Sequence, residues 1–79
     1  GLNKSLAKEG APYGVRVNCI APGPVLTRPG MACLKTALGR AAEPQEIVNM
    51  VLYLASEKSS VMTGATILMD GGRHLLMND

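Results

Sequence analysis

A chain of 79 residues, 47% hydrophobic and 18% charged, has the composition of a folded globular segment and not of a disordered one. Its eight basic and six acidic residues form no basic stripe, so nucleic-acid binding is not expected. Its apolar stretches are too short for a membrane-spanning helix. Cys19 and Cys33 fit neither a disulfide framework nor a metal site, and they indicate reduced thiols in a cytoplasmic protein.

The first predicted element is a helix that places Leu2 and Leu6 on one face. Gly10, as a left-handed cap, and Pro12 beyond it are predicted to end this helix. The chain starts at Gly1 inside the helical pattern, without Met or a signal sequence, so we expect it to be a part of something larger.

The second predicted element is a strand over Val15–Ala21 (VRVNCIA), which is rich in β-forming residues and alternates only loosely. This pattern is typical of a strand that is covered on both faces. Pro22-Gly23-Pro24 ends the strand abruptly. Residues 28 to 42 are irregular, with a short helix expected at Met31–Leu38.

The clearest helix begins at Glu43-Pro44, because proline suits a first helical turn and acidic groups favour the positive end of the helix dipole. Its apolar residues form one stripe at helical spacing: Ile47, Val48, Val51, Leu54 and Ala55. The polar segment Ser56–Ser60 breaks the pattern, and Thr66–Met69 is a second short strand that ends at Asp70-Gly71-Gly72.

The order helix, strand, loop, helix, strand predicts the α/β class, with two parallel strands and a crossover helix in one right-handed βαβ unit. A parallel sheet needs helices on both faces, and the one or two helices here do not suffice. A chain of this length is also only marginally stable alone. We therefore expect residues 1–79 to be the C-terminal part of a single domain whose N-terminal part is absent.

Several strings resemble the classical short-chain dehydrogenase/reductase family, in the family's order and across nearly the whole chain. They are Leu6-Ala7-Lys8-Glu9, Tyr13-Gly14-Val15-Arg16-Val17-Asn18, Ala21-Pro22-Gly23-Pro24-Val25-Leu26-Thr27, Gly39-Arg40, Glu43-Pro44-Gln45-Glu46-Ile47, Tyr53-Leu54-Ala55-Ser56, Thr63-Gly64 and Asp70-Gly71-Gly72. The resemblance implies a partial Rossmann fold, a doubly wound parallel sheet of which this chain supplies the last two strands with their crossover helix. It also implies an oxidoreductase that uses NAD or NADP to interconvert an alcohol and a carbonyl.

By this resemblance the cofactor-binding residues are Pro22, Gly23, Val25 and Thr27. Pro22 and Gly23 would shape the approach, Val25 would offer backbone bonds to the nicotinamide carboxamide, and Thr27 would bond the carboxamide or the pyrophosphate. Ligands in such folds sit beyond the C-terminal ends of the strands, which is where this loop begins. The alternative is that Pro22-Gly23-Pro24 merely terminates a strand.

The family's catalytic pair, a Tyr with a Lys four residues later, is absent from this chain, so we assign no catalytic residue. Tyr13 is followed four residues later by Val17, and Tyr53 by Glu57. Lys58 lies five residues after Tyr53, roughly 140° around a helix of about 3.6 residues per turn. Tyr53 is better interpreted as a packing residue.

The phosphate-binding glycine motif is also absent, because Arg16 stands where a third glycine would follow Gly10 and Gly14. Asn18 could bond loop backbone near the site or act as a buried structural amide. We expect Arg40 to make a structural ion pair or a C-cap contact, and we expect no function for His74 in a polar tail. Met31–Leu38 matches the family's substrate lid in position only, and it is short.

Two hypotheses follow for the function. In the first, the chain belongs to a dehydrogenase acting on a small-molecule alcohol or carbonyl, and the missing N-terminal part of the domain supplies the glycines, Ser, Tyr and Lys. The resemblance implies that the parent is a homodimer or homotetramer, because the last strand lies at a sheet edge in this family and such an edge needs protection. In the second, the chain is a truncated, non-catalytic paralogue that acts as a binding or oligomerisation module.

Overall fold

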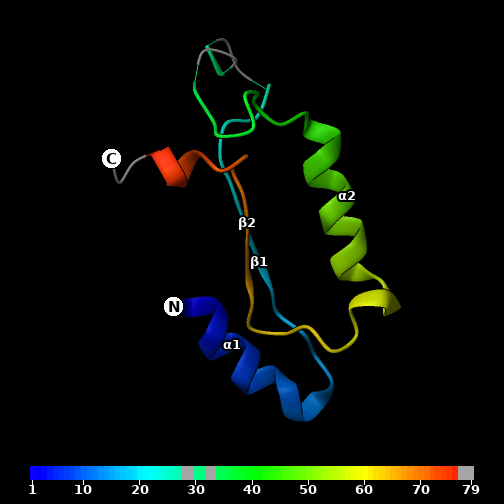
Figure 1. The fold of residues 1–79 in the computed structure, drawn as a ribbon. Helices are drawn as coiled ribbons and strands as arrows, with labels where there is room; N and C mark the ends of the chain where they lie inside the picture. The colour runs from blue at the N-terminus through cyan, green and yellow to red at the C-terminus, as the bar shows by residue number, and fades with distance from the viewer. Residues whose placement is uncertain (28–29, 32–33, 77–79) are drawn as a thin grey trace.

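The computed structural model describes residues 1–27, 30–31 and 34–76, and it contains two parallel strands flanked by helices (Figure 1). The α/β class and the order of elements agree with the sequence prediction. In chain order the elements are α1 (Leu2–Gly10), the 3-10 helix η1 (Ala11–Tyr13), β1 (Cys19–Pro22), α2 (Pro44–Ala55), the 3-10 helix η3 (Glu57–Ser59), β2 (Thr66–Met69) and the 3-10 helix η4 (Arg73–Leu76).

The end of α1 differs from the prediction, because Gly10 is not a left-handed cap. Gly10 has a right-handed backbone (φ −78°, ψ −23°), and the chain tightens into η1 before Gly14 turns it at φ 73°. The N–H of Gly14 donates to the carbonyl of Ala11 at 3.0 Å, which closes this turn. Pro12 is compatible with the first turn of a 3-10 helix, where its missing N–H costs nothing. Gly14 therefore has the role that the sequence pattern assigned to Gly10.

The strand predicted at Val15–Ala21 begins later, at Cys19, and includes Pro22. The residues before Cys19 bond to the segment that precedes β2 and not to β2 itself. The N–H of Val17 donates to the hydroxyl of Thr63 at 3.1 Å, and the carbonyl of Val17 accepts the N–H of Gly64 at 2.7 Å. β1 and β2 then pair in parallel from Cys19↔Thr66 to Pro22↔Met69, which confirms the predicted pair of parallel strands joined by a crossover helix.

Helix α2 begins where the sequence predicted. Glu43 is its N-cap, and the carboxylate of Glu46 accepts the N–H of Glu43 at 2.9 Å, which satisfies one free donor at the helix start. The short helix expected at Met31–Leu38 includes residues 32 and 33, which lie outside the described residues. Residues 34–38 are not helical, and in the described part the segment before α2 is a series of turns.

Little apolar surface is buried. The two fully buried hydrophobic side chains of the described residues, Ala7 and Ala41, are both small, and no side chain of α2 is fully buried, although Ile47 and Leu54 are half-buried. Val48 and Val51, on the predicted apolar stripe, are 45% and 49% exposed. The chain exposes 5747 Å², whereas a compact protein of 8.3 kDa would expose about 4600 Å².

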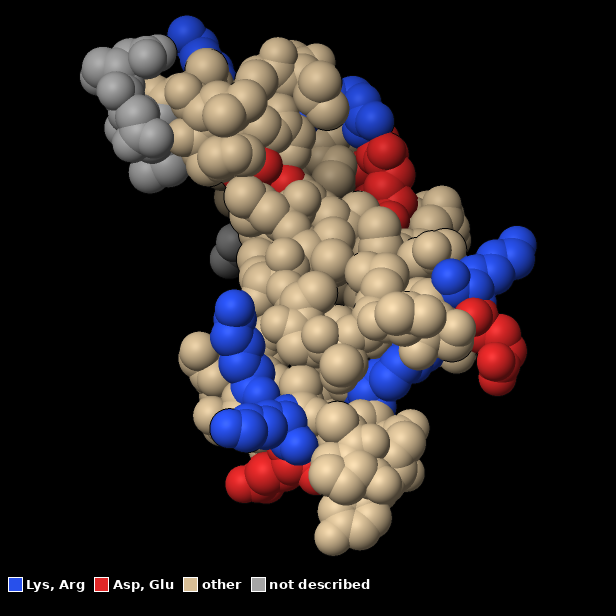
Figure 2. All heavy atoms as spheres, turned by 60° about the horizontal axis from the view of Figure 1, so that its bottom comes forward, with Lys and Arg blue, Asp and Glu red and all other residues tan. Residues whose placement is uncertain are grey.

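This openness is also visible in the shape of the chain. The radius of gyration is 14.7 Å, against about 12 Å for a compact chain of this length. Figure 2 shows uncharged residues across the middle of one face, with the charged groups gathered toward its edges and ends. In the described part of the chain no helix is long and apolar enough to cross a membrane. The apolar faces of the sheet and of α2 are thus left without the covering layers that a parallel sheet needs.

Candidate functional site

The predicted loop, residues 22–27, leaves the C-terminal end of β1 and passes beside the C-terminal end of β2 (Figure 1). The N–H of Gly23 donates to the carbonyl of Met69 at 3.1 Å and extends the pairing of the two strands by one bond. The loop therefore lies at the edge of the sheet where open α/β folds place their ligands.

Gly23 makes the closest backbone approach in this loop. A Cβ atom at this position would lie 2.6 Å from the Cβ and 2.7 Å from the Cα of Asp70. These distances are shorter than real Cβ contacts, and both Asp70 atoms belong to or adjoin the backbone, so they cannot rotate away. The requirement for glycine at position 23 therefore comes from packing against Asp70.

Val25 is held by a parallel bridge to Ala42, which lies just before α2. The N–H of Ala42 donates to the carbonyl of Pro24 at 2.8 Å, and its carbonyl accepts the N–H of Leu26 at 2.9 Å. In a parallel bridge of this kind the peptide groups of the central residue point away from the partner. The N–H of Val25 accordingly donates to none of the described residues, whereas its carbonyl accepts the N–H of Thr27 at 2.7 Å.

The structure thus places Pro22 at the end of β1, and Gly23, Val25 and Thr27 in the loop that follows, which is bonded on both sides. Thr27 is exposed, so its hydroxyl is accessible from solvent. An outward N–H and an accessible hydroxyl are the kinds of group that can bond an amide. A neighbouring cavity of about 380 Å³ lies between Leu38, Ala42, Leu68 and the 70–72 turn, and no residue of the 22–27 loop lines it.

The turn beneath the loop is organised by Asp70. One oxygen of its carboxylate accepts the N–H of Gly72 at 2.9 Å, and the other accepts the N–H of His74 at 2.9 Å and its ring Nδ1 at 2.8 Å. Desolvation raises the pKa of Asp70, but the bonds from His74 and Gly72 outweigh it and leave that pKa below its ordinary value. The sequence suggested that His74 lies in a polar tail. In the structure His74 lies in η4 and has Asp70 as its partner.

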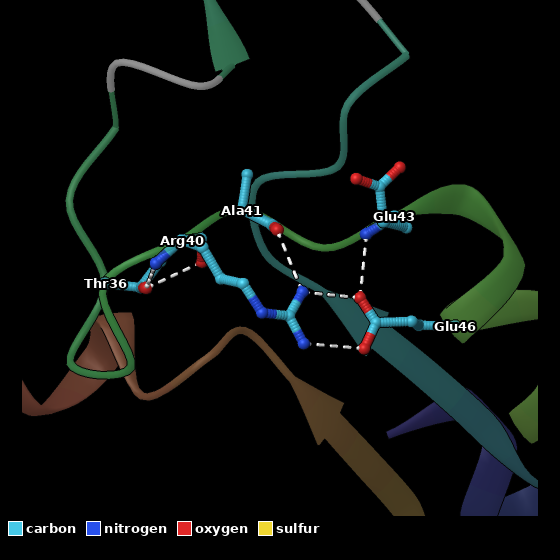
Figure 3. Close-up of polar contacts among 5 residues, drawn as sticks. All are labelled: Thr36, Arg40, Ala41, Glu43 and Glu46. Carbon is cyan, nitrogen blue, oxygen red and sulfur yellow. Dashed lines mark hydrogen bonds and ion pairs between the residues drawn. The ribbon is translucent and has the colours of Figure 1, made fainter.

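A bidentate ion pair joins the segment after the loop to α2 (Figure 3). The guanidinium of Arg40 contacts the carboxylate of Glu46 at 2.6 Å and 2.8 Å, and Nη1 also donates to the carbonyl of Ala41 at 3.3 Å. The hydroxyl of Thr36 donates to the carbonyl of Arg40 at 2.8 Å and accepts its N–H at 3.1 Å. The predicted ion pair of Arg40 is confirmed. Arg40 binds the first turn of α2 and makes no C-cap contact among the described residues.

The ion pair gives Glu46 a distinct acid titration. Hydrogen bonding from Arg40, and next from the backbone of Glu43, lowers the pKa of Glu46 to about 2. Because this pKa is lowered by folding, the stabilisation by Glu46 is present above its ordinary pKa of 4.5 and is lost as the pH falls toward 2. We expect the pKa of Glu46, measured as the midpoint of its side-chain NMR titration, to rise toward 4.5 in Arg40→Gln and to stay unchanged in the control Lys58→Gln. An unchanged Glu46 midpoint in Arg40→Gln would contradict the ion pair.

Arg16 organises the opposite end of the sheet, a structural role that the sequence did not predict. One branch of its guanidinium donates to the carbonyl of Leu54 at 2.8 Å, and the other to the carbonyl of Ser59 at 2.9 Å. Weaker contacts reach the carbonyls of Ser56 and Met62. Arg16 thus satisfies carbonyl groups at the C-terminus of α2 and in the turn beyond it.

Asn18 lies at the same end and bonds the carbonyl of Met62 at 3.0 Å and the N–H of Ala65 at 3.1 Å. It is therefore a half-buried structural amide that precedes β1, at the opposite end of that strand from the 22–27 loop. Tyr13 is 84% exposed, and the hydroxyl of Tyr53 bonds the carbonyl of Lys58 at 3.2 Å and not its ammonium group. Among the described residues, no three His, Cys, Asp or Glu side chains come together in a way that could hold a metal ion.

Comparison with known proteins gives consistent matches over nearly the whole chain. A family model described as enoyl-(acyl carrier protein) reductase matches residues 1–74. A 3-alpha-(or 20-beta)-hydroxysteroid dehydrogenase from Mycobacterium bovis is 51% identical over 76 residues, which cover 91% of this chain and 29% of that protein. A trans-4-hydroxycyclohexanecarboxylate dehydrogenase from Sinomonas cyclohexanicum is 49% identical over 77 residues, with the same coverage of 91% and 29%.

Solved structures agree with these relatives. A 3-oxoacyl-(acyl-carrier protein) reductase from Brucella melitensis with bound NAD matches with a TM-score of 0.84 and 39% identity, over 91% of this chain and 29% of that one. The chain spans less than a third of the length of each of these three proteins.

Proposed function

Because the chain belongs to the short-chain dehydrogenase/reductase family, we propose that it forms the nicotinamide-side part of an oxidoreductase that uses NAD or NADP to interconvert an alcohol and a carbonyl. In this proposal residues 1–79 are the C-terminal part of a single Rossmann domain. The remainder of that domain supplies the phosphate-binding glycines and the catalytic Ser, Tyr and Lys.

One observation carries the proposal: the loop after β1 presents a backbone N–H at Val25 that donates to none of the described residues, beside the accessible hydroxyl of Thr27. A nicotinamide carboxamide needs both a donor and an acceptor to fix which ring face meets the substrate. The N–H of Val25 can donate to the carboxamide oxygen, and the hydroxyl of Thr27 can accept from the amide nitrogen or bond a phosphate.

The bound cofactor supplies the hydride chemistry, and the role of this chain is to bind and orient it. Gly23 keeps the loop close to Asp70, and the bridge to Ala42 fixes the direction of the Val25 peptide groups. Two pinned sides limit the loop to a narrow range of positions, so the orienting groups lose little conformational freedom on binding. The NAD held by the Brucella melitensis relative supports a nicotinamide cofactor.

The proposal also accounts for the open surface. The apolar face of α2 and the free edge of β1 would be covered by the missing N-terminal part of the domain, and the edge of β2 by a second copy in a homodimer or homotetramer. The substrate would be a small-molecule alcohol or carbonyl. If the chain instead acts as a non-catalytic binding module, its exposed apolar residues would serve only for association.

A chimera tests the proposal, with this chain replacing the aligned segment of the Mycobacterium bovis hydroxysteroid dehydrogenase. We expect it to oxidise the hydroxysteroid with NAD or NADP. Thr27→Val is expected to raise the KM for the cofactor about two- to twelvefold, the effect of one lost hydrogen bond of about 0.5–1.5 kcal/mol. The control Thr66→Val, at the far end of β2, should leave that KM unchanged. A folded chimera that binds neither cofactor would refute the proposed function and favour the binding module.

A further inference from the structure

We propose that Asp70 is a positioning residue for the cofactor loop and sets the orientation of the Val25 peptide from the turn beneath it. This inference rests on the proposed function of the 22–27 loop. Asp70 touches no part of a cofactor in the proposal. Asp70 reaches the loop by two routes. One is the direct contact of its backbone with Gly23, and the other passes through Gly71, Gly72 and the segment before α2 to Val25.

The first contact is direct. The backbone of Gly23 lies so close to the Cα and Cβ of Asp70 that not even one methyl group would fit between them. The adjacent bond from the N–H of Gly23 to the carbonyl of Met69 holds this contact in place. Any shift of the Asp70 backbone is therefore transmitted to the loop without an intervening flexible side chain.

The second contact passes through the glycines after Asp70. The carboxylate is only 11% exposed and accepts three N–H groups, two of them from backbone. Gly71 and Gly72 have φ values of 63° and 82°, in the left-handed region, and the bonds to the carboxylate of Asp70 stabilise this conformation. Without the carboxylate as an acceptor the turn loses the bonds that define its shape.

The third contact returns to the loop. The carbonyl of Gly71 accepts the N–H of Leu38 at 2.9 Å, and a Cβ atom at Gly72 would lie 2.7 Å from the Cβ of Ala37. Arg73 adds a bond from Nη1 to the carbonyl of Lys35 at 2.7 Å. The held segment continues to Ala42, whose N–H and carbonyl flank Val25. Asp70 thus supports both sides of the loop, one through Gly23 and one through Ala42.

Asp70→Asn tests this arrangement because it keeps the size of the side chain and replaces one acceptor oxygen by a donor. In one amide orientation the new NH₂ group faces the N–H and ring of His74, and in the other it faces the N–H of Gly72. Each orientation sets donor against donor. In the chimera we expect the KM for the cofactor to rise about tenfold, while the KM for the hydroxysteroid changes less than about twofold.

The matched control is Glu57→Gln, the same change of carboxylate to amide in η3, away from the loop. It should alter neither KM. His74→Gln, which removes the ring and keeps both backbone bonds to Asp70, should raise the cofactor KM by less than Asp70→Asn does. Equal KM values in Asp70→Asn and the unsubstituted chimera would overturn the proposal, as would a parallel rise in both KM values with a lower melting temperature, since that pattern indicates only a structural role.

A second measurement separates this inference from the proposed function. If the chimera folds but does not bind the cofactor, the proposed function fails, and the amide NMR signals of Gly23 and Val25 still report the loop position. Shifts of both signals in Asp70→Asn but not in Glu57→Gln would support the positioning role. Unchanged signals would overturn it, whatever the outcome of the cofactor assay.

Discussion

Gly23→Ala in the chimera is expected to raise the KM for the cofactor by about tenfold or more. The new Cβ would lie 2.6 Å from the Cβ of Asp70, so the loop or the turn must move apart. Overpacking of this kind costs about 1–3 kcal/mol. The displacement would break the bond from Gly23 to Met69 and carry Val25 away from the position that the proposed function requires.

The matched control is Gly14→Ala, which adds the same methyl group where nothing lies within 4 Å. Because Gly14 has φ 73°, this change is strained and lowers stability by about 1 kcal/mol, but it leaves the loop in place. Cofactor titrations and thermal melts of both variants give the comparison. A cofactor KM that rises equally in both variants would show that lost stability, and not the contact with Asp70, controls binding.

Replacing Arg16 with methionine is expected to lower the free energy of unfolding of the chimera by about 3–5 kcal/mol, because charge-assisted bonds contribute about 1.5–3 kcal/mol each. Two short bonds, to the carbonyls of Leu54 and Ser59, are lost, and the carbonyls at the end of α2 keep no charged donor. Arg16→Lys should recover only part of the loss, because one ammonium group cannot reproduce the two branches of a guanidinium.

Arg73→Met serves as the matched control for Arg16, since Arg73 makes a single side-chain bond, to the carbonyl of Lys35. Because this bond is charge-assisted but exposed to solvent, we expect its loss to lower the free energy of unfolding by no more than about 1.5 kcal/mol, the lower end of the range for such bonds. Urea titrations of Arg16→Met, Arg16→Lys and Arg73→Met measure the free energy of unfolding of each variant. If Arg16→Met and Arg73→Met lose equal stability, the several bonds seen for Arg16 do not act together.

The parts of the fold that could be predicted are those set by neighbouring residues. The start of α2 follows from Glu43-Pro44 and the acidic group at Glu46, which meet within one turn of helix. The start of β1 depends instead on which residues it faces in the 62–66 segment, and the sequence does not carry that pairing locally. The sequence predicted Gly10 as the cap of α1, but the chain continues through a 3-10 turn that tolerates Pro12, and Gly14 takes the left-handed position.

For the candidate site, the position of the loop followed from the rule that ligands lie beyond the strand ends, together with the family resemblance. The reason for Gly23 did not, because Asp70 lies 47 residues further along the chain and meets it only in the folded sheet. The spacing of four residues between Asp70 and His74 is a local signal for their pairing. It was missed because the polar residues around His74 suggested an unstructured tail. The role of Arg16 had no local signal, since its acceptors are backbone carbonyls at distant positions.

Polar bonds hold helix α2 at both of its ends. None of its side chains is fully buried, and the bonds of Arg40 to Glu46 fix its beginning while the bonds of Arg16 fix its end. The tasks of placing the helix and of contacting neighbouring layers therefore fall to different residues. Substitutions on the outward apolar face, such as at Val48 or Val51, can change what packs against the helix while its position over the sheet is kept. Such a division allows the surface of one scaffold to diverge between relatives without moving the loop beside it.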